Sequence, residues 1–344
     1  MNKTIGFPDS PRVQGKSQCQ VPMWVGVNGD GIKSECNENK PKVHVRGLNG
    51  FTILVLFVAI VGGLLFGLDI GTAAITSMNS FREEMGIPLL EPGVIDSPST
   101  TQQLSLFTVI FHASTLIGAP FAGALSDRFG RKPVILIACS AFGLGAVWQA
   151  LAGLLSSHFA WSSIILGRVL GGIGNGFVLT IMPVYASELS PQQYRGKVIT
   201  LFQFNIAVGI FLMSVFNSLL DKYQWGWRVG FAVQCIPCLV IILLTLFALP
   251  ESPRYLMRRC KFAKAQQALA RLCKGDERAE EIVTAELDGI QQEIESIKTS
   301  GEGTFSELFQ GGALPTTLCA LMIAFSQNIT GVNWFMNYAT QLFS

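Results

Sequence analysis

Two charged side chains interrupt long apolar stretches of this 344-residue chain. Arg168 lies in the run SSIILGRVLGGIGNG, and Asp69 lies in the run GGLLFGLDIGTAAI. An arginine at membrane depth costs roughly 2.5–3.5 kcal/mol on insertion scales, so it normally faces a protein interior and has a partner. A carboxylate beside a guanidinium stays ionised, and it takes up a proton once the guanidinium moves away. The two residues therefore predict a buried ion pair that loads and releases a proton.

The depth of the two charges in their spans supports this pairing. If the first span runs outward from Phe51 to Met78, Asp69 lies nine residues before its outer end. If the span that starts at Ser162 runs inward, Arg168 lies six residues below the same face. With a rise of about 1.5 Å per residue, the two lie within roughly 5 Å of one level. The alternatives are two charges that extend separately to the outer headgroups, or a pair with a purely structural role.

The composition indicates a membrane protein. Hydrophobic residues make up 49% of the chain and charged residues 14%, and the 24 phenylalanines exceed what a soluble surface tolerates. A net charge of +2, without interleaved basic and aromatic residues, argues against a nucleic-acid partner. The three scattered histidines form no metal cluster and no nucleophile–base pair, so we expect neither a cofactor nor an enzyme.

Hydropathy and charge predict the topology. Seven apolar stretches read as transmembrane helices, at residues 51–78, 104–126, 133–155, 162–187, 198–220, 228–249 and 314–343. Lys and Arg crowd the polar amino-terminal tail, two short turns and the segment after residue 250, so the positive-inside rule places these in the cytoplasm. The predicted domains are a disordered tail at 1–48, a six-helix bundle at 49–250, a cytoplasmic helical linker at 251–313 and a seventh transmembrane helix at 314–344.

Glycine spacing predicts how the spans associate. Lipid offers no hydrophobic drive for helix association, so small residues four apart let two backbones approach closely. The first span has such a face at Gly63, Gly67 and Gly71, and the fourth span has two, at Gly167 with Gly171 and at Gly172 with Gly176. We therefore expect these faces to lie close against neighbouring helices.

The linker contains two amphipathic helices by its apolar spacing. The first has apolar positions at Phe262, Ala265, Leu269 and Leu272, and the second at Val283, Leu287, Ile290, Ile294 and Ile297. The first helix is basic and the second acidic, which predicts that they pack on each other and on the cytoplasmic turns. The alternative is that the basic helix rests on anionic lipid headgroups.

Five motifs together resemble those of one transporter family. The turn GALSDRFGRK at 123–132 resembles the signature between the second and third helices of the major facilitator superfamily. Four further motifs occur in the expected order and narrow the resemblance to its sugar porter family: GR at 167–168, PVYASELSP at 183–191, PESPR at 250–254 and QNITGVN at 327–333. The resemblance covers residues 50–344.

This resemblance implies an all-α membrane protein with the major facilitator fold, in which two six-helix halves close alternately around a central site. Each half is a 3+3 inverted repeat. This chain would supply the first bundle, the linker and the first helix of the second bundle. We therefore expect the missing carboxyl-terminal half to be needed for activity.

The resemblance also assigns candidate sugar ligands. Gln203 corresponds to a fifth-helix glutamine of the family, and Phe66 to an aromatic wall three residues before the acid. The seventh-helix ligands correspond to Gln327, Asn328 and Asn333. Amide side chains suit a polyol because each offers donors and an acceptor. The alternative for any single intramembrane amide is a helix–helix hydrogen bond.

A set of charged residues at the predicted cytoplasmic helix ends forms a candidate latch, made when the inner side is shut and broken when it opens. Its members are Asp127, Arg128, Arg131, Glu188, Arg195, Glu251 and Arg254. Exposed ion pairs are individually weak, about 0–1 kcal/mol, so only a network would bias the equilibrium. The alternative is that these charges only set the membrane orientation. The positive-inside rule would explain the arginines at these helix ends but not the glutamates. We expect His112, in the second span, to make a helix–helix contact rather than relay protons.

The sequence thus favours a multi-pass transporter of a hexose or related polyol, working by alternating access. Expected partners are the sugar, a proton and the lipid bilayer, and the expected location is the plasma membrane with a cytoplasmic amino terminus. Asp69 and Arg168 favour proton symport. A facilitative uniporter and a non-transporting sugar sensor with the same fold are the alternatives.

Overall fold

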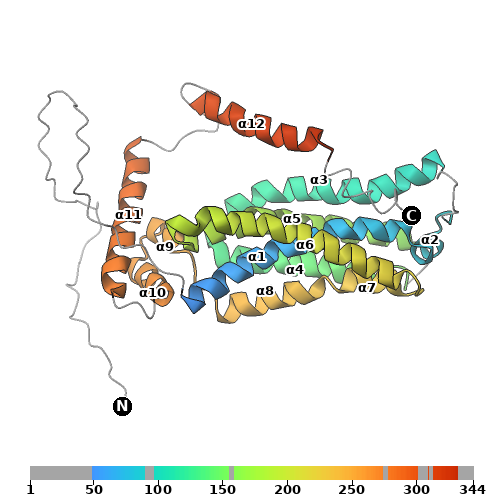
Figure 1. Cartoon of the computed structure of the whole chain (residues 1–344), viewed down its shortest axis with the longest axis horizontal. Helices are drawn as coiled ribbons and strands as arrows, with labels where there is room; N and C mark the ends of the chain where they lie inside the picture. Colours follow the sequence, from blue (N-terminus) through green and yellow to red (C-terminus); the bar gives the residue numbers. More distant parts are fainter. Residues whose placement is uncertain are drawn as a thin grey trace, which may run out of the picture. The chain divides into compact units, whose positions relative to one another are not determined.

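The computed structural model describes residues 49–89, 97–154, 159–273, 278–300, 309 and 313–331, and every regular element in these ranges is helical. Figure 1 shows the order of the helices along the chain. The α-helices are α1 (Gly50–Gly71), α2 (Asn79–Met85), α3 (Pro98–Phe129), α4 (Arg131–Ala150), α5 (Ala160–Leu189), α6 (Arg195–Leu220), α7 (Gly226–Ala232), α8 (Cys235–Phe247), α9 (Pro253–Arg258), α10 (Phe262–Leu272), α11 (Ala279–Ser300) and α12 (Leu314–Ile329). Two 3₁₀ helices, η1 (Thr72–Ser77) and η3 (Gln192–Tyr194), join them.

Within the described ranges, six helical segments are long and apolar enough to cross a membrane. They are Gly50–Ser77, Pro98–Phe129, Arg131–Ala150, Ala160–Leu189, Arg195–Leu220 and Gly226–Phe247. Each one overlaps one of the first six predicted spans, so the predicted all-α membrane architecture is confirmed. The predicted seventh span is described only as α12, which has 16 residues. The rest of that span and the predicted tail lie outside the described residues.

The six spans lie side by side in Figure 1, and the most extensive contacts join α1 to α6 and α5 to both α3 and α4. Along α1, the three glycines at 63, 67 and 71 all face α6. A Cβ atom on Gly67 would overlap the carbonyl oxygen of Ile206, so a larger residue would push α1 and α6 apart. The glycines of α5 lie in the same way against α4 and α3. The predicted role of glycine spacing in helix association is therefore confirmed.

The sixth span is broken, whereas the sequence predicted one continuous helix at 228–249. It consists of α7 and α8, which a turn at Val233 and Gln234 separates. Pro237 accounts for the break, since proline has no N–H to donate to the carbonyl of Val233, four residues earlier. Ile236 N–H bonds to that carbonyl instead, at 3.1 Å. Pro120 and Pro183, by contrast, remain inside α3 and α5.

At one end of the bundle, which we call the α2 end, the short helix α2 is anchored by two neighbouring side chains. Phe81 is fully buried and makes edge-to-face contacts with Phe107 of α3 and Trp227 of α7. Arg82 is also buried and donates to the carbonyl oxygens of Thr76 and Pro88, at 3.0 and 3.1 Å. These contacts hold α2 across the ends of the neighbouring helices.

At the other end, the α9 end, α9, α10 and α11 pack on one another as the amphipathic spacing predicted. Ala265, Leu269 and Leu272 of α10 are buried. The carbonyl of Leu272 accepts hydrogen bonds from Asn49 and Thr52 at the start of α1, which joins α10 to the bundle. Two predicted apolar contacts are wrong, because Phe262 and Ile297 are 49% and 43% exposed. Both lie near an end of their helix, where few neighbours cover a side chain.

Candidate functional site

Two close helix contacts position the charged pair. The glycine face of α1 sets it against α6, and α5 packs between α3, α4 and α1. This arrangement places Asp69 of α1 opposite Arg168 of α5, although 99 residues separate them in sequence. Arg168 Nη1 donates to both carboxylate oxygens of Asp69, at 2.9 and 3.1 Å. The contact expected from their equal depth is therefore present.

Both side chains of this pair are almost completely buried, each with 3% of its surface exposed. Arg168 Nη2 also donates to Thr72 Oγ1 at 2.6 Å, and Thr72 Oγ1 donates to the carbonyl oxygen of Asp69. Sequence reasoning missed Thr72. Its position three residues after Asp69, on the same helical face, was the available signal.

Aromatic rings surround the guanidinium. The Cζ atom of Arg168 lies 3.8 Å from the ring centroid of Phe107, 5.2 Å from that of Phe111 and 5.4 Å from that of Phe231. A desolvated cation over an aromatic face gains about 2 kcal/mol or more. These three rings come from α3 and α7. None of them was predicted from the sequence to contact Arg168. Arg168 therefore keeps favourable contacts with these rings whether or not Asp69 is protonated.

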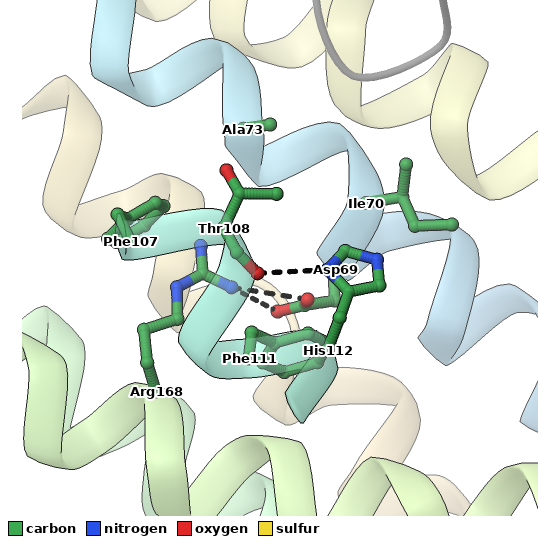
Figure 2. Close-up of a pocket in the computed structure, with 8 residues that line it drawn as sticks. All are labelled: Asp69, Ile70, Ala73, Phe107, Thr108, Phe111, His112 and Arg168. Carbon is green, nitrogen blue, oxygen red and sulfur yellow. Dashed lines mark hydrogen bonds and ion pairs between the residues drawn. The ribbon is translucent and has the colours of Figure 1, made fainter. Parts of the chain in front are cut away.

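A small pocket, with an empty volume of about 200 Å³ that includes its open mouth, adjoins the pair. Figure 2 shows its lining: Asp69, Ile70, Ala73, Phe107, Thr108, Phe111, His112 and Arg168. His112 is exposed, and its Nδ1 atom lies 2.9 Å from the carbonyl oxygen of Thr108 in the same helix. His112 therefore faces residues of α1 across the pocket, while its described hydrogen bond stays within α3.

Arg131 is the centre of the latch cluster at the α9 end. Its guanidinium binds Glu188 through two hydrogen bonds, from Nε at 3.1 Å and from Nη2 at 2.9 Å. Nη1 donates to the carbonyl oxygen of Ser126 and to Asp127 Oδ1, at 3.1 and 3.3 Å. Two parallel bonds between arginine and a carboxylate are stronger and more directional than one. The structure therefore brings Arg131, Glu188 and Asp127 together.

Glu251 completes the latch cluster by capping α4. Its Oε1 atom accepts the backbone N–H of Arg131 at 2.8 Å and that of Lys132 at 3.3 Å, which are the first two residues of α4. A carboxylate is favoured there because the helix dipole and free N–H groups attract negative charge. Gly130 adopts φ +103° at this point, and a Cβ atom there would collide with Glu251.

Two other predicted latch residues contact side chains outside the Arg131 cluster. Arg254 donates to Glu293 of α11 at 3.0 Å, so it joins α9 to α11 rather than closing the bundle. Arg128 stacks on Phe129, 5.5 Å from its ring centroid, at the end of the same helix. Arg195 is the first residue of α6. The described side-chain contacts of Arg128 and Arg254 thus lie outside the Arg131 cluster, and their membership of the latch stays a prediction.

The candidate sugar ligands are described only in part. Gln203 is exposed on α6, and Phe66 is half-buried on α1, which packs against α6. The backbones of Gln327 and Asn328 are part of α12, but their side chains are not among the described parts of the structure. Asn333 lies wholly outside the described residues. The described residues therefore neither assemble nor separate the five proposed ligands.

Three comparisons identify the family. The family "Sugar (and other) transporter" matches residues 55–344. The chain is 31% identical over 315 residues to the sugar transport protein MST7 of Oryza sativa subsp. japonica, covering 89% of this chain and 59% of that protein. It is 33% identical over 307 residues to the H(+)/hexose cotransporter 2 of Parachlorella kessleri, covering 87% of this chain and 55% of the relative. The chain thus spans less than two thirds of the length of these relatives.

Solved structures show the same fold. A partially occluded inward-open structure of the xylose transporter XylE from E. coli matches with a TM-score of 0.67 and 24% identity, over 84% of this chain and 66% of that one. A structure of the major facilitator superfamily proton:xylose symporter XylE with 6-bromo-6-deoxy-D-glucose matches with a TM-score of 0.60 and 28% identity, over 72% of this chain and 54% of that one. Together with the bundle and its motifs, these matches show that the chain belongs to the sugar transporter family of the major facilitator superfamily.

Proposed function

We propose that the protein moves a hexose or related sugar across its membrane by alternating access, and that a proton drives the movement. The observation that carries this proposal is the buried Asp69–Arg168 pair beside an open pocket. Relatives include proteins named as an H(+)/hexose cotransporter and a proton:xylose symporter, which supports the assignment of a proton to the pair. The relatives are transporters rather than enzymes.

The pair explains how a proton could be coupled to helix movement. While Asp69 is ionised, its attraction to Arg168 holds α1 against α5. A proton on Asp69 removes this attraction, and Arg168 keeps the ring of Phe107 and the hydroxyl of Thr72. The two helices are then free to separate without leaving the guanidinium alone in a dry interior. Binding and release of one proton would thereby bias the opening of the bundle.

The sugar would bind where the family motif places it. Gln203 and Phe66 lie on the adjacent helices α6 and α1 and would supply an amide and an apolar wall. Gln327, Asn328 and Asn333 would complete the site from the seventh helix. Amide groups suit this role because each both donates and accepts hydrogen bonds to hydroxyl groups.

The latch cluster would close the cytoplasmic side. In this orientation the amino terminus and the linker are cytoplasmic, the α2 end faces outward, and the protein resides in the plasma membrane. The contacts of Arg131 with Glu188 and of Glu251 with the start of α4 join three separate parts of the chain at the α9 end. Opening this end would break them, so they would favour the outward-facing state.

The test is uptake of labelled sugar by the complete gene product, with and without a proton gradient. Asp69→Asn removes the titrating group and keeps the side-chain size. We expect accumulation against a gradient to vanish while downhill exchange of sugar persists. Accumulation that survives the substitution at normal expression would refute coupling through Asp69. Sugar binding without any transport would instead favour a sensor, and transport that ignores the gradient in the unmodified protein would favour a uniporter.

A further inference from the structure

We propose that His112 carries protons between water and Asp69. This inference rests on the proposed proton coupling and adds a second residue to it. His112 is the titratable side chain on α3 that lines the same pocket as Asp69. It is exposed, whereas only 3% of the Asp69 side chain is. A buried acid exchanges protons with water faster through such an intermediate group, and Figure 2 shows the imidazole ring beside Asp69.

The hydrogen bond of the imidazole ring determines which of its two nitrogen atoms carries the hydrogen. Nδ1 lies 2.9 Å from the backbone carbonyl oxygen of Thr108, which can only accept, so Nδ1 carries the hydrogen. The neutral ring therefore has its lone pair on Nε2. The ring of Phe111 meets the imidazole edge to face, with centroids 5.8 Å apart and an interplanar angle of 83°. These two contacts orient the imidazole without using Nε2.

The transfer itself has two balanced steps. Nε2 takes a proton from a hydronium ion, which leaves water and an imidazolium with a hydrogen on each nitrogen. The Nε2–H bond then breaks as an O–H bond forms on the Asp69 carboxylate, directly or through one water molecule. The imidazole returns to its neutral form and the carboxylate becomes a carboxylic acid. Imidazole suits this role because one nitrogen can accept a proton while the other keeps its hydrogen.

The charged surroundings of the pocket are simple. Within its described lining, the titratable groups are Asp69 from α1, Arg168 from α5 and His112 itself. Where α6 approaches Gly67 and Gly71 of α1, the nearest residues are Ile206, Gly209, Ile210 and Met213, which carry no charge. Asp69 attracts an imidazolium and Arg168 repels it, and their mutual pairing limits both effects. Nothing else in the described lining would compete with Asp69 for the proton.

A purely structural role explains His112 poorly. Its described hydrogen bond and ring contact, with Thr108 and Phe111, lie within α3, and its described interaction with a second helix is the electrostatic one with Asp69 across the pocket. An exposed apolar or small polar residue would serve helix packing at this position equally well. A titratable ring at the mouth of a pocket that contains a buried carboxylate is therefore better explained by proton exchange.

The experiment uses His112→Ala in the complete gene product, reconstituted in vesicles with an imposed proton gradient. We expect proton-driven sugar accumulation to slow by about 100-fold, the lower end of the range for general acid–base groups, with downhill exchange retained. Imidazole added to the buffer should restore accumulation, because it can occupy the space left by the ring. The matched control is Thr200→Val. Thr200 of α6 is also exposed and bonded to the carbonyl four residues back, but it does not line the pocket.

A second readout separates this inference from the proposed function. Labelling of Asp69 with dicyclohexylcarbodiimide requires the protonated carboxyl group and does not require transport. After a rapid drop in pH, we expect His112→Ala to label slowly and imidazole to restore the rate. Normal accumulation and labelling in His112→Ala, with accumulation lost in Asp69→Asn, would overturn the inference and leave the proposed function standing. Slow transport that imidazole does not rescue would also overturn it, since that is the result of a structural role.

Discussion

Two of the arginine–carboxylate sites in the described part of this protein, at Arg168 and at Arg131, differ in how their contacts are distributed. At the first site, Arg168 and Asp69 are each 3% exposed, and the carboxylate has one cationic partner in the ion pair. In the latch cluster, Arg131 is 6% exposed, but Glu188 and Asp127 are 11% and 67% exposed. The latch also includes backbone carbonyl and N–H groups as partners.

This difference determines what can switch each site. In the dry pair, one proton on Asp69 removes the ionic attraction between α1 and α5, so a single protonation has a large effect. In the latch cluster, several acceptors share the interaction, and water screens the exposed ones. No single proton would open it. Under the proposed function, the same chemical pair would thus sense protons at Asp69 and close the bundle at Glu188.

The largest effect should come from removing the cation of the dry pair. Arg168→Ala leaves a buried carboxylate without its partner, which costs about 3–5 kcal/mol. We expect a large loss of thermal stability of the complete gene product in detergent. Arg128→Ala is the control, because Arg128 is exposed at a helix end. Equal stability of the two variants would mean that the dry pair contributes little.

A smaller effect is expected at the centre of the latch cluster. Arg131→Ala removes two bonds to Glu188 and leaves that carboxylate partly solvated, which should cost about 2–3 kcal/mol. The α9 end should open more often. A cysteine introduced in place of Ser190, which is 3% exposed, should then react faster with a water-soluble thiol reagent. An unchanged reaction rate would show that Arg131 only helps to orient the chain in the membrane and does not hold the α9 end closed.

The aromatic partner of Arg168 should matter less than its carboxylate. Phe107→Leu keeps an apolar side chain and removes the ring that lies 3.8 Å from the guanidinium. Phe142→Leu is a matched control, since Phe142 is 1% exposed and packs against α5 near Gly174. We expect Phe107→Leu to lower the unfolding free energy by about 1–2 kcal/mol more than the control does. A difference near zero would show that Thr72 and Asp69 suffice to hold the cation.

The smallest effect should be at the exposed pair between α9 and α11. The side chains of Arg254 and Glu293 are 26% and 49% exposed, so Arg254→Ala should cost less than about 1 kcal/mol. It should also leave the reaction of the Ser190→Cys probe unchanged. A rate increase as large as that of Arg131→Ala would place Arg254 functionally in the latch, against its contacts.

The sequence by itself determined that the protein lies in a membrane, how many spans form its bundle, and that Asp69 pairs with Arg168. These follow from quantities that can be counted along one chain: hydropathy, charge and depth at a fixed rise per residue. Glycine spacing likewise predicted which faces of the first and fourth spans approach other helices. A glycine lacks a side chain, so it allows close approach of a backbone whichever helix the partner is.

Tertiary structure alone decided what surrounds each charge. The ring of Phe107 over Arg168, the pocket beside His112 and the diversion of Arg254 to α11 all depend on the rotation and tilt of neighbouring helices. The break in the sixth span also depends on context, since Pro120 and Pro183 leave their helices intact while Pro237 follows a turn. Such angles come from the packing of many side chains at once, and no local spacing along the chain specifies them.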